Sequence, residues 1–296
     1  MSLMKGCNRL HKSRHVQIWT AVLCIAAAST VYLAAGLAGK HNHAVISSVR
    51  EKPAQVLLAA KQDPVPWNVM TYNIRHAKGT DDITSIRRIA QVIRQEQANI
   101  VALQEVDSYL WRSGFQNQVE ELARELGMNW AFAPSLKLGR FAYGNAILSH
   151  YPIVSATSLS LGGLRENRIL LKAVVATDWG EIEVFTTHLG LSEKERERQM
   201  PLLLRHLERA QEPAFLLGDF NMEAAHPLLQ LLPERWNKLE QTEKRGTIMG
   251  NREIDHIYAV WPEAAAMRVQ EVYVPVTIAS DHLPVVARFI SEAAVD

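Results

Sequence analysis

The sequence has little cysteine and no excess of charge of either sign. Its only cysteines, Cys7 and Cys24, lie near the N-terminus of a 296-residue chain. Nothing after residue 24 can therefore form a disulfide, act as a thiol nucleophile or build a cysteine-based zinc site. Thirty-two Lys and Arg against 31 Asp and Glu give a net charge of +1. A generally basic nucleic-acid-coating protein is excluded, and any anion site must be local.

The sequence also lacks internal repeats and low-complexity tracts. Hydrophobic residues make up 48% and charged residues 21%, which excludes disorder across the whole chain. The length allows one large domain or two small ones. A core of this size can be held by packing alone.

One long stretch, residues 18–39, carries no charge. As a helix, its 22 residues extend about 33 Å, enough to cross a bilayer core. Residues 1–17 contain Lys5, Arg9, Lys12 and Arg14 and no acid. Because positive charge stays on the cytoplasmic side, we expect a cytoplasmic tail (1–17), a single-pass transmembrane signal-anchor (18–39) in the cell membrane, and an extracytoplasmic location for the rest of the chain.

Two other interpretations of this stretch stay open. Small residues around Ala34–Ala38 are compatible with a cleaved signal peptide, which would make the protein secreted. A buried soluble helix is disfavoured because the run has no polar face. Residues 40–66, with three prolines, are expected to be a linker, and residues 67–292 a single domain.

From Trp67 onward, short apolar runs alternate with amphipathic stretches. The patterns predict helices at 84–97, 118–126 and 193–210, and a short one at 227–232. They predict strands at 69–74, 100–104, 146–149, 168–176, 182–187, 214–217, 254–259, 269–274 and 285–290. Some connections are helical and others hairpin-like, which favours a layered α/β (α+β) protein with mixed sheets.

Polar side chains gather where the predicted strands end. Five strands are followed by acid, amide or imidazole groups, and a sixth begins with them: Asn73, Glu105, His188, Asp219 with Asn221, Asp281 with His282, and Asp255 with His256. Each alone is compatible with a turn or a helix cap. Together they predict one polar cavity, because charged groups beside buried strands are costly unless they pair or bind metal.

The residue types indicate the chemistry of this cavity. Oxygen ligands from carboxylates and amides suit a hard cation such as Mg²⁺ or Mn²⁺. Histidines beside carboxylates supply acid–base and charge-stabilising groups. This combination is what hydrolysis of a phosphoester P–O bond needs.

At these motifs (MTYN, LQE, THL, GDFN and SDH, in that order) the chain resembles the endonuclease/exonuclease/phosphatase superfamily, which includes deoxyribonuclease I and the exonuclease III type of enzyme. The resemblance covers about Trp67 to Ile290. It implies a four-layer sandwich of two packed mixed β-sheets flanked by helices, with the site at one end.

The resemblance also implies roles for single residues. Glu105 would be the principal metal ligand, with Asn73 and Asp281 as further ligands. Catalytic roles fall on His188, Asp219, Asn221, Asp255 and His282, with Asp255 orienting His282. Asn145 and Arg112 are expected to contact substrate. Arg168 fits either a substrate contact or a solvated charge at a strand end.

The substrate class is less defined by sequence. Two partners are expected: a phosphodiester, in a nucleic acid or a phospholipid headgroup, and the membrane, which the N-terminal helix would enter. No protein partner can be inferred. A nuclease is the first expectation. A phospholipid, sphingomyelin or inositol-phosphate phosphoesterase of the same fold is the second, and a non-catalytic pseudoenzyme that binds phosphorylated ligands is the third.

Overall fold

The computed structural model describes residues 45–47, 67–164, 166–262 and 267–291, all of which belong to one compact unit, His41–Asp296. The predicted tail (1–17), signal-anchor (18–39) and most of the linker (40–66) lie outside the described residues. Among the residues that are described, no helix combines the length and the apolar character needed to cross a bilayer.

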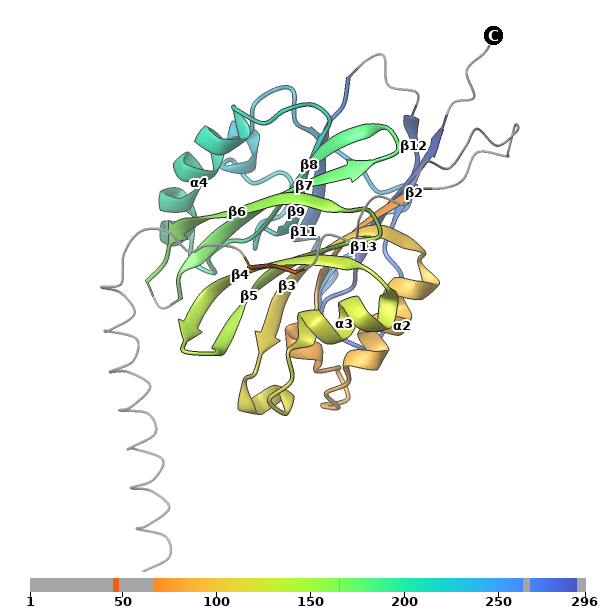
Figure 1. Cartoon of the computed structure of the whole chain (residues 1–296). Helices are drawn as coiled ribbons and strands as arrows, with labels where there is room; N and C mark the ends of the chain where they lie inside the picture. Colours follow the sequence, from red (N-terminus) through yellow and green to blue (C-terminus); the bar gives the residue numbers. More distant parts are fainter. Residues whose placement is uncertain (1–44, 48–66, 165, 263–266, 292–296) are drawn as a thin grey trace, which may run out of the picture. The chain divides into compact units, whose positions relative to one another are not determined.

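Two mixed β-sheets form the centre of this unit (Figure 1). The first has the order β1 (Val45–Ser47), β4 (Asn129–Leu138), β5 (Phe141–Ser149), β3 (Ala98–Ser108), β2 (Trp67–Asn73), β13 (Val285–Ser291) and β12 (Met267–Tyr273). The second has the order β10 (Asn237–Lys238), β11 (Asp255–Val260), β9 (Ala214–Asp219), β8 (Gly180–His188), β7 (Arg168–Thr177) and β6 (Ile153–Gly162).

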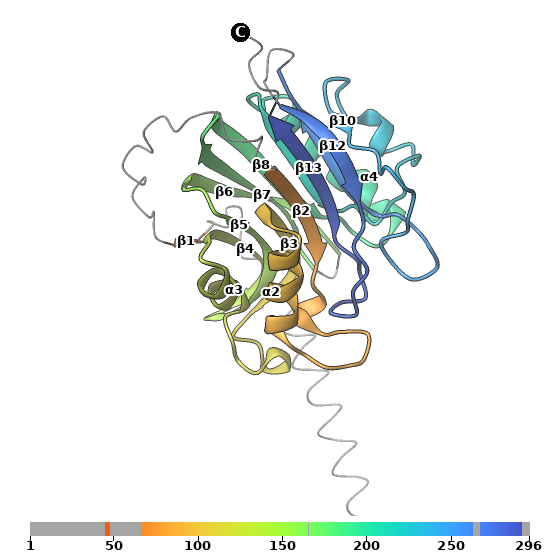
Figure 2. The ribbon, with the colours of Figure 1, turned by 90° about the vertical axis from the view of Figure 1, so that its right-hand side faces the viewer.

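Helices cover the outer faces of both sheets (Figure 2). Helices α2 (Ile86–Gln95) and α3 (Gln118–Leu126) share an apolar cluster with the first sheet, and α4 (Glu193–Leu207) shares one with the second. A third cluster, which includes Val69, Ile100, Leu171 and Phe215, fills the space between the sheets. The predicted sandwich of two mixed sheets flanked by helices is therefore confirmed.

Local signals explain where the helices lie. In α2 the buried residues Ile86, Ile89, Ala90 and Ile93 follow the helical period. Helix α4 begins with a capping box, in which the Ser192 side chain accepts from the backbone N–H of Glu195 and the Glu195 side chain accepts in return. Three short 3₁₀ helices complete the set: η1 (Arg75–Ala77), η2 (Trp111–Ser113) and η3 (Leu229–Leu231).

The sheets contain strands that the sequence pattern did not predict. Strand β4 contains Pro134, which lies at an irregularity in its pairing with β5, and proline weakens a strand prediction. Strand β6 is rich in Ser and Thr and largely half-buried or exposed. Within the segment expected to be a linker, Val45–Ser47 pairs with β4 as an edge strand.

The topology gathers strand ends at one end of the sandwich. Among the described strands, each sheet has one parallel pair, β2–β3 in the first and β8–β9 in the second. The carboxyl ends of parallel neighbours meet at the same edge. Strands β11 and β13 run antiparallel to β9 and β2, so they begin at this end. The polar residues that follow or precede these strands therefore converge.

Candidate active site

Asn73 links the two sheets at the centre of the candidate site. Its side-chain Nδ2 donates to Oε1 of Glu105 at 3.1 Å and to Oδ2 of Asp219 at 3.0 Å. Glu105 belongs to the first sheet and Asp219 to the second. Asn73 is fully buried, and its backbone carbonyl accepts a hydrogen bond of 2.8 Å from Oγ of Ser280. Two carboxylates from opposite sheets therefore face one fixed amide.

A β-bulge places Glu105 in this position. Leu103 and Val106 both pack in the outer core under the helices, although strict alternation would put residues three apart on opposite faces. The pairing of β3 with β5 shifts between these two residues, and Glu105 adopts a left-handed φ of 60°. Such a conformation is costly for a residue with a side chain, and it is common at functional sites.

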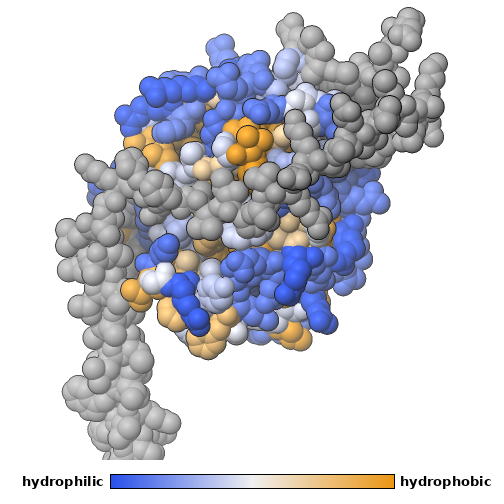
Figure 3. All heavy atoms as spheres, in the orientation of Figure 1, coloured by the Kyte–Doolittle hydropathy of each residue, from blue (hydrophilic) through white to orange (hydrophobic). Residues whose placement is uncertain are grey.

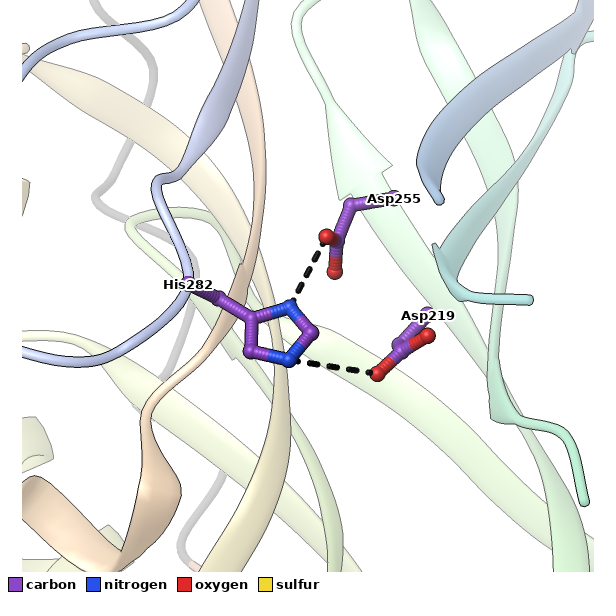
Figure 4. A group of neighbouring side chains, drawn as sticks. All are labelled: Asp219, Asp255 and His282. Carbon is purple, nitrogen blue, oxygen red and sulfur yellow. Dashed lines mark hydrogen bonds and ion pairs between the residues drawn. The ribbon is translucent and has the colours of Figure 1, made fainter. Parts of the chain in front are cut away.

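His282 lies between two buried carboxylates (Figure 4). Its Nδ1 is 2.9 Å from Oδ2 of Asp255, and its Nε2 is 3.8 Å from Oδ2 of Asp219. Burial alone lowers the pKa of an imidazole, but the charges of Asp255, Asp219 and Asp281 and the hydrogen bond to Asp255 outweigh it and raise the pKa of His282 to about 10. The ring is therefore a cation at neutral pH.

The register of the second sheet sets Asp219 beside both Asp255 and His188, its partners on β11 and β8. Burial, and then repulsion from Asp255, raise the pKa of Asp219 to about 7, against the attraction of His282. His188 has its Nε2 3.4 Å from Oδ2 of Asp219. Burial, followed by the charges of Arg168 and His282, holds the pKa of His188 well below its ordinary value. One imidazole of the site is neutral and the other is charged.

A second network of polar groups adjoins Glu105. Arg168 is buried and pairs with Oε1 of Glu166 at 3.5 Å, and the same oxygen accepts 2.9 Å from Oγ of Ser135. Burial raises the pKa of Glu166. Asn145, on the neighbouring strand β5, is 3% exposed, and its Nδ2 has no hydrogen-bond partner. A buried amide donor of this kind is costly unless a ligand accepts from it.

Three other predicted site residues are held by neighbours. The backbone N–H of Asn221 donates to Oδ1 of Asp219 at 2.9 Å, and its Nδ2 donates to the carbonyl of Leu189. The carboxylate of Asp281 forms an ion pair of 3.3 Å with Arg75. Arg112 binds the buried carboxylate of Asp107 through two hydrogen bonds, of 2.9 and 2.7 Å, and lies over the ring of Tyr143.

The donors at the centre of the site fit a hard divalent cation. Glu105 and Asp219 offer carboxylate oxygens on either side of Asn73, and Oδ1 of Asp255 is buried without a hydrogen-bond partner. Ligand atoms of Asp219, Asp255 and His282 also lie within 4.8 Å of one another. Because His282 is protonated against Asp255, we assign metal binding to the carboxylate side and not to the imidazole.

Sequence reasoning missed part of this arrangement. Glu166 and Ser135 were not predicted; Glu166 lies in the bend two residues before β7, outside the strand pattern that drew attention to Arg168. Gln104 donates from Nε2 to Oγ1 of Thr186 at 2.9 Å, a second polar link between the sheets below Asn73. An isolated Gln in an apolar strand gives no signal of such a partner.

The fold and the site define a class of two-sheet sandwich proteins in which both sheets supply acidic and imidazole groups at one end. A family model places the chain within this class. It matches residues 70–282, and the chain belongs to the endonuclease/exonuclease/phosphatase family.

Known relatives share the fold and part of the sequence. The "Uncharacterized protein YbhP" of Escherichia coli K12 is 29% identical over 155 residues, which are 47% of this chain and 61% of that protein; the chain thus spans less than two thirds of its length. An endonuclease/exonuclease/phosphatase from Beutenbergia cavernae has a TM-score of 0.64 at 23% identity, covering 77% of this chain and 72% of that chain. D. rerio TDP2, in complex with a single-strand DNA product, has a TM-score of 0.61 at 17% identity, covering 76% and 98%.

Proposed function

We propose that this protein is a divalent-metal-dependent phosphodiesterase of the nuclease type, with Mg²⁺ or Mn²⁺ as cofactor. One observation carries the proposal: Asn73 bonds carboxylates from both sheets, and the charged imidazole of His282 lies 3.8 Å from one of them. Acidic groups for a cation and a fixed positive group for a phosphate thus share one buried site.

Each residue has a role that its surroundings support. Glu105, Asp219 and Asn73 would hold the metal, which would supply charge to polarise a phosphoryl oxygen and to lower the pKa of water. His282, oriented by Asp255, stabilises the negative charge that grows on the phosphate. Neutral His188 is suited to exchange a proton with water or the leaving group.

Nucleic acid is the preferred substrate class. The unpartnered Nδ2 of Asn145 and the buried guanidinium of Arg168 provide two phosphate-directed donors on the first and second sheets. The DNA product bound to TDP2 shows that a relative of the same fold accommodates a nucleic-acid strand. A lipid headgroup phosphodiester is the second candidate, since both chemistries share the scissile group.

The purified full chain tests this proposal. We expect it to cleave bis-p-nitrophenyl phosphate with Mg²⁺ or Mn²⁺, to lose activity in EDTA, and to cleave DNA or RNA faster than phospholipids or inositol phosphates. Asp219→Asn should abolish turnover, whereas the matched change Asp178→Asn, in the β7–β8 turn, should not. Absence of turnover on every substrate would support a phosphate-binding pseudoenzyme instead.

We also propose that residues 18–39 anchor the protein in the cell membrane with the catalytic domain outside the cytoplasm. The support is the uncharged run and the basic segment that precedes it. Protease added to intact cells should digest the domain. Full protection would contradict this orientation.

A further inference from the structure

Exposed apolar side chains concentrate at the end of the sandwich that carries the site. Fourteen large hydrophobic residues are exposed among those that the structure describes, and ten of them lie at this end, on the connections between strands or on the strand residues next to them. Soluble surfaces usually scatter such residues singly, and a concentration marks an interaction surface. We call these ten residues the apolar rim.

The most prominent part of the apolar rim is formed by two neighbouring loops of the first sheet. Trp111 and Phe115 follow β3 and are 76% and 55% exposed, and Leu138 and Phe141, on the β4–β5 hairpin, are 56% and 36% exposed. The rings of Phe115 and Phe141 have centroids 6.5 Å apart, so the loops form one continuous tip. Figure 3 shows apolar residues along the lower margin, below the ends of β4 and β5 in the same view.

The rest of the apolar rim comes from other loops around the site. Leu164 and Leu191 follow β6 and β8 of the second sheet, and Met249 lies in the loop before β11. Val276 and Ile278 precede Ser280, which donates to the carbonyl of Asn73. Ile83 lies near Ile278, because the backbone N–H of Gly79 donates to the carbonyl of Ile83 and that of Thr80 donates to the carbonyl of Ile278. Loops of both sheets thus surround the catalytic groups with apolar side chains.

The charges of the tip complement an anionic surface. Residues 108–117 and 136–144 contain no acid but include Arg112, Lys137 and Arg140. Asp107, which precedes the first segment, is fully buried and pairs with Arg112, so the charges of the tip that face an anionic surface are those of Lys137 and Arg140. Exposed Trp, Phe and Leu together with Lys and Arg are the composition of segments that insert into the membrane interface.

We propose that the tip of the apolar rim docks on an anionic phospholipid membrane, with Trp111, Phe115 and Leu138 entering the boundary between headgroups and acyl chains. The catalytic groups, at the same end of the sandwich as the tip, would then lie close to the membrane surface. This inference goes beyond the proposed function, since it concerns where the domain binds and not which bond it cleaves.

Contacts within the tip reduce the number of ring faces on which single-stranded nucleic acid could stack. The guanidinium of Arg140 lies 5.1 Å from the ring centroid of Tyr109 and 5.6 Å from that of Phe141, and Arg112 lies 5.1 Å from Tyr143. One face of each of these three rings is therefore covered, whereas base stacking requires free faces. Trp111 and Phe115 are the exposed rings that remain. Leu138 is aliphatic and offers no ring to a base.

Fluorescence quenching tests the proposal without measuring activity. The full chain would be reconstituted in vesicles of phosphatidylcholine with and without phosphatidylglycerol, using lipids with brominated acyl chains. The fluorescence of Trp111 is obtained by subtracting the spectrum of Trp111→Phe from that of the wild type, because the other tryptophans contribute to both. We expect bromolipids to quench this difference signal, and more strongly when phosphatidylglycerol is present.

Matched variants give the controls. Trp179 is the control, since it is 40% exposed in the β7–β8 turn and lies outside the rim. The fluorescence difference between the wild type and Trp179→Phe should not be quenched. Lys137→Gln with Arg140→Gln should reduce quenching in anionic vesicles to the level in phosphatidylcholine. An unquenched Trp111 signal in anionic vesicles would overturn the proposal, and a response to a single-stranded oligonucleotide in its place would assign the tip to nucleic acid.

Discussion

Asp255 and His282 form a buried pair in which Nδ1 of the imidazole lies 2.9 Å from a carboxylate oxygen. They come from different sheets, since Asp255 opens β11 and His282 precedes β13. The pair keeps the ring charged and points Nε2 toward Asp219. Asp255 therefore controls the protonation state of His282.

The first prediction concerns this pair. Asp255→Asn removes the charge that raises the pKa of His282, so we expect kcat to fall by about 10²–10⁴-fold with little change in KM. The alkaline limb of the pH–rate profile should move to lower pH, because the imidazole loses its proton earlier. Steady-state kinetics across pH would measure both effects, and an unchanged alkaline limb would show that His282 does not act as a cation.

The second prediction concerns the metal. Glu105→Gln should weaken Mg²⁺ or Mn²⁺ binding by about tenfold or more, because it removes a carboxylate beside Asn73. Isothermal titration calorimetry would measure the affinity. The fold should survive, since the amide oxygen of Gln can still accept the hydrogen bond from Nδ2 of Asn73. Glu120→Gln, exposed on α3, is the matched control, and equal affinities in both variants would remove Glu105 from the ligand set.

The third prediction concerns Gly218, which precedes Asp219. A Cβ at this position would lie 2.1 Å from the carbonyl oxygen of Thr187 on β8. Gly218→Ala should therefore force the parallel pair apart, cost about 1–3 kcal/mol of stability and lower activity. Gly114→Ala has a left-handed φ of 72° but no atom within 4 Å, so it should cost only about 1 kcal/mol and keep activity. Urea unfolding would compare the two.

The fourth prediction concerns acid stability. Burial alone raises the pKa of a carboxyl, but bonds from His256 and Lys238 outweigh it and lower the pKa of Glu253 to about 2. Because the folded pKa is depressed, this stabilisation is present above about pH 4.5 and is lost as the pH falls toward 2. It amounts to about 2–3 kcal/mol at most.

Thermal unfolding between pH 6 and 2 tests this assignment. Glu253→Gln should show a smaller loss of stability with falling pH than the wild type. The control is Glu240→Gln, which removes the exposed partner of the same lysine. If both variants kept the wild-type acid slope, the buried bonds of Glu253 would contribute nothing.

Sequence patterns predicted most of the sandwich because helical and strand periods are local. Helix 118–126 was predicted with the boundaries that the structure shows, since its buried positions follow one face. Strands β4 and β6 were not predicted, because Pro134 and a run of Ser and Thr obscure their alternation. Pairing with neighbours, which is not local, stabilises both.

In the candidate site too, features that depend on local sequence were predicted, and features that depend on strand pairing were not. Asn73, Glu105, Asp219, Asp255 and His282 were predicted together because each adjoins a strand end, and the structure brings them into contact. The bulge at Glu105 could not be predicted, since it depends on the register between β3 and β5. For Arg112, the expected substrate contact stays a prediction, because its guanidinium is already bound to Asp107.

The bond from Asn73 to Asp219 has a consequence for the growing chain. Its partners are 146 residues apart, and the imidazole that completes the site comes 63 positions later still. A polypeptide that stops before His282 has neither the charged imidazole nor strand β13. The proposed hydrolysis should therefore require synthesis of the chain through His282 and β13.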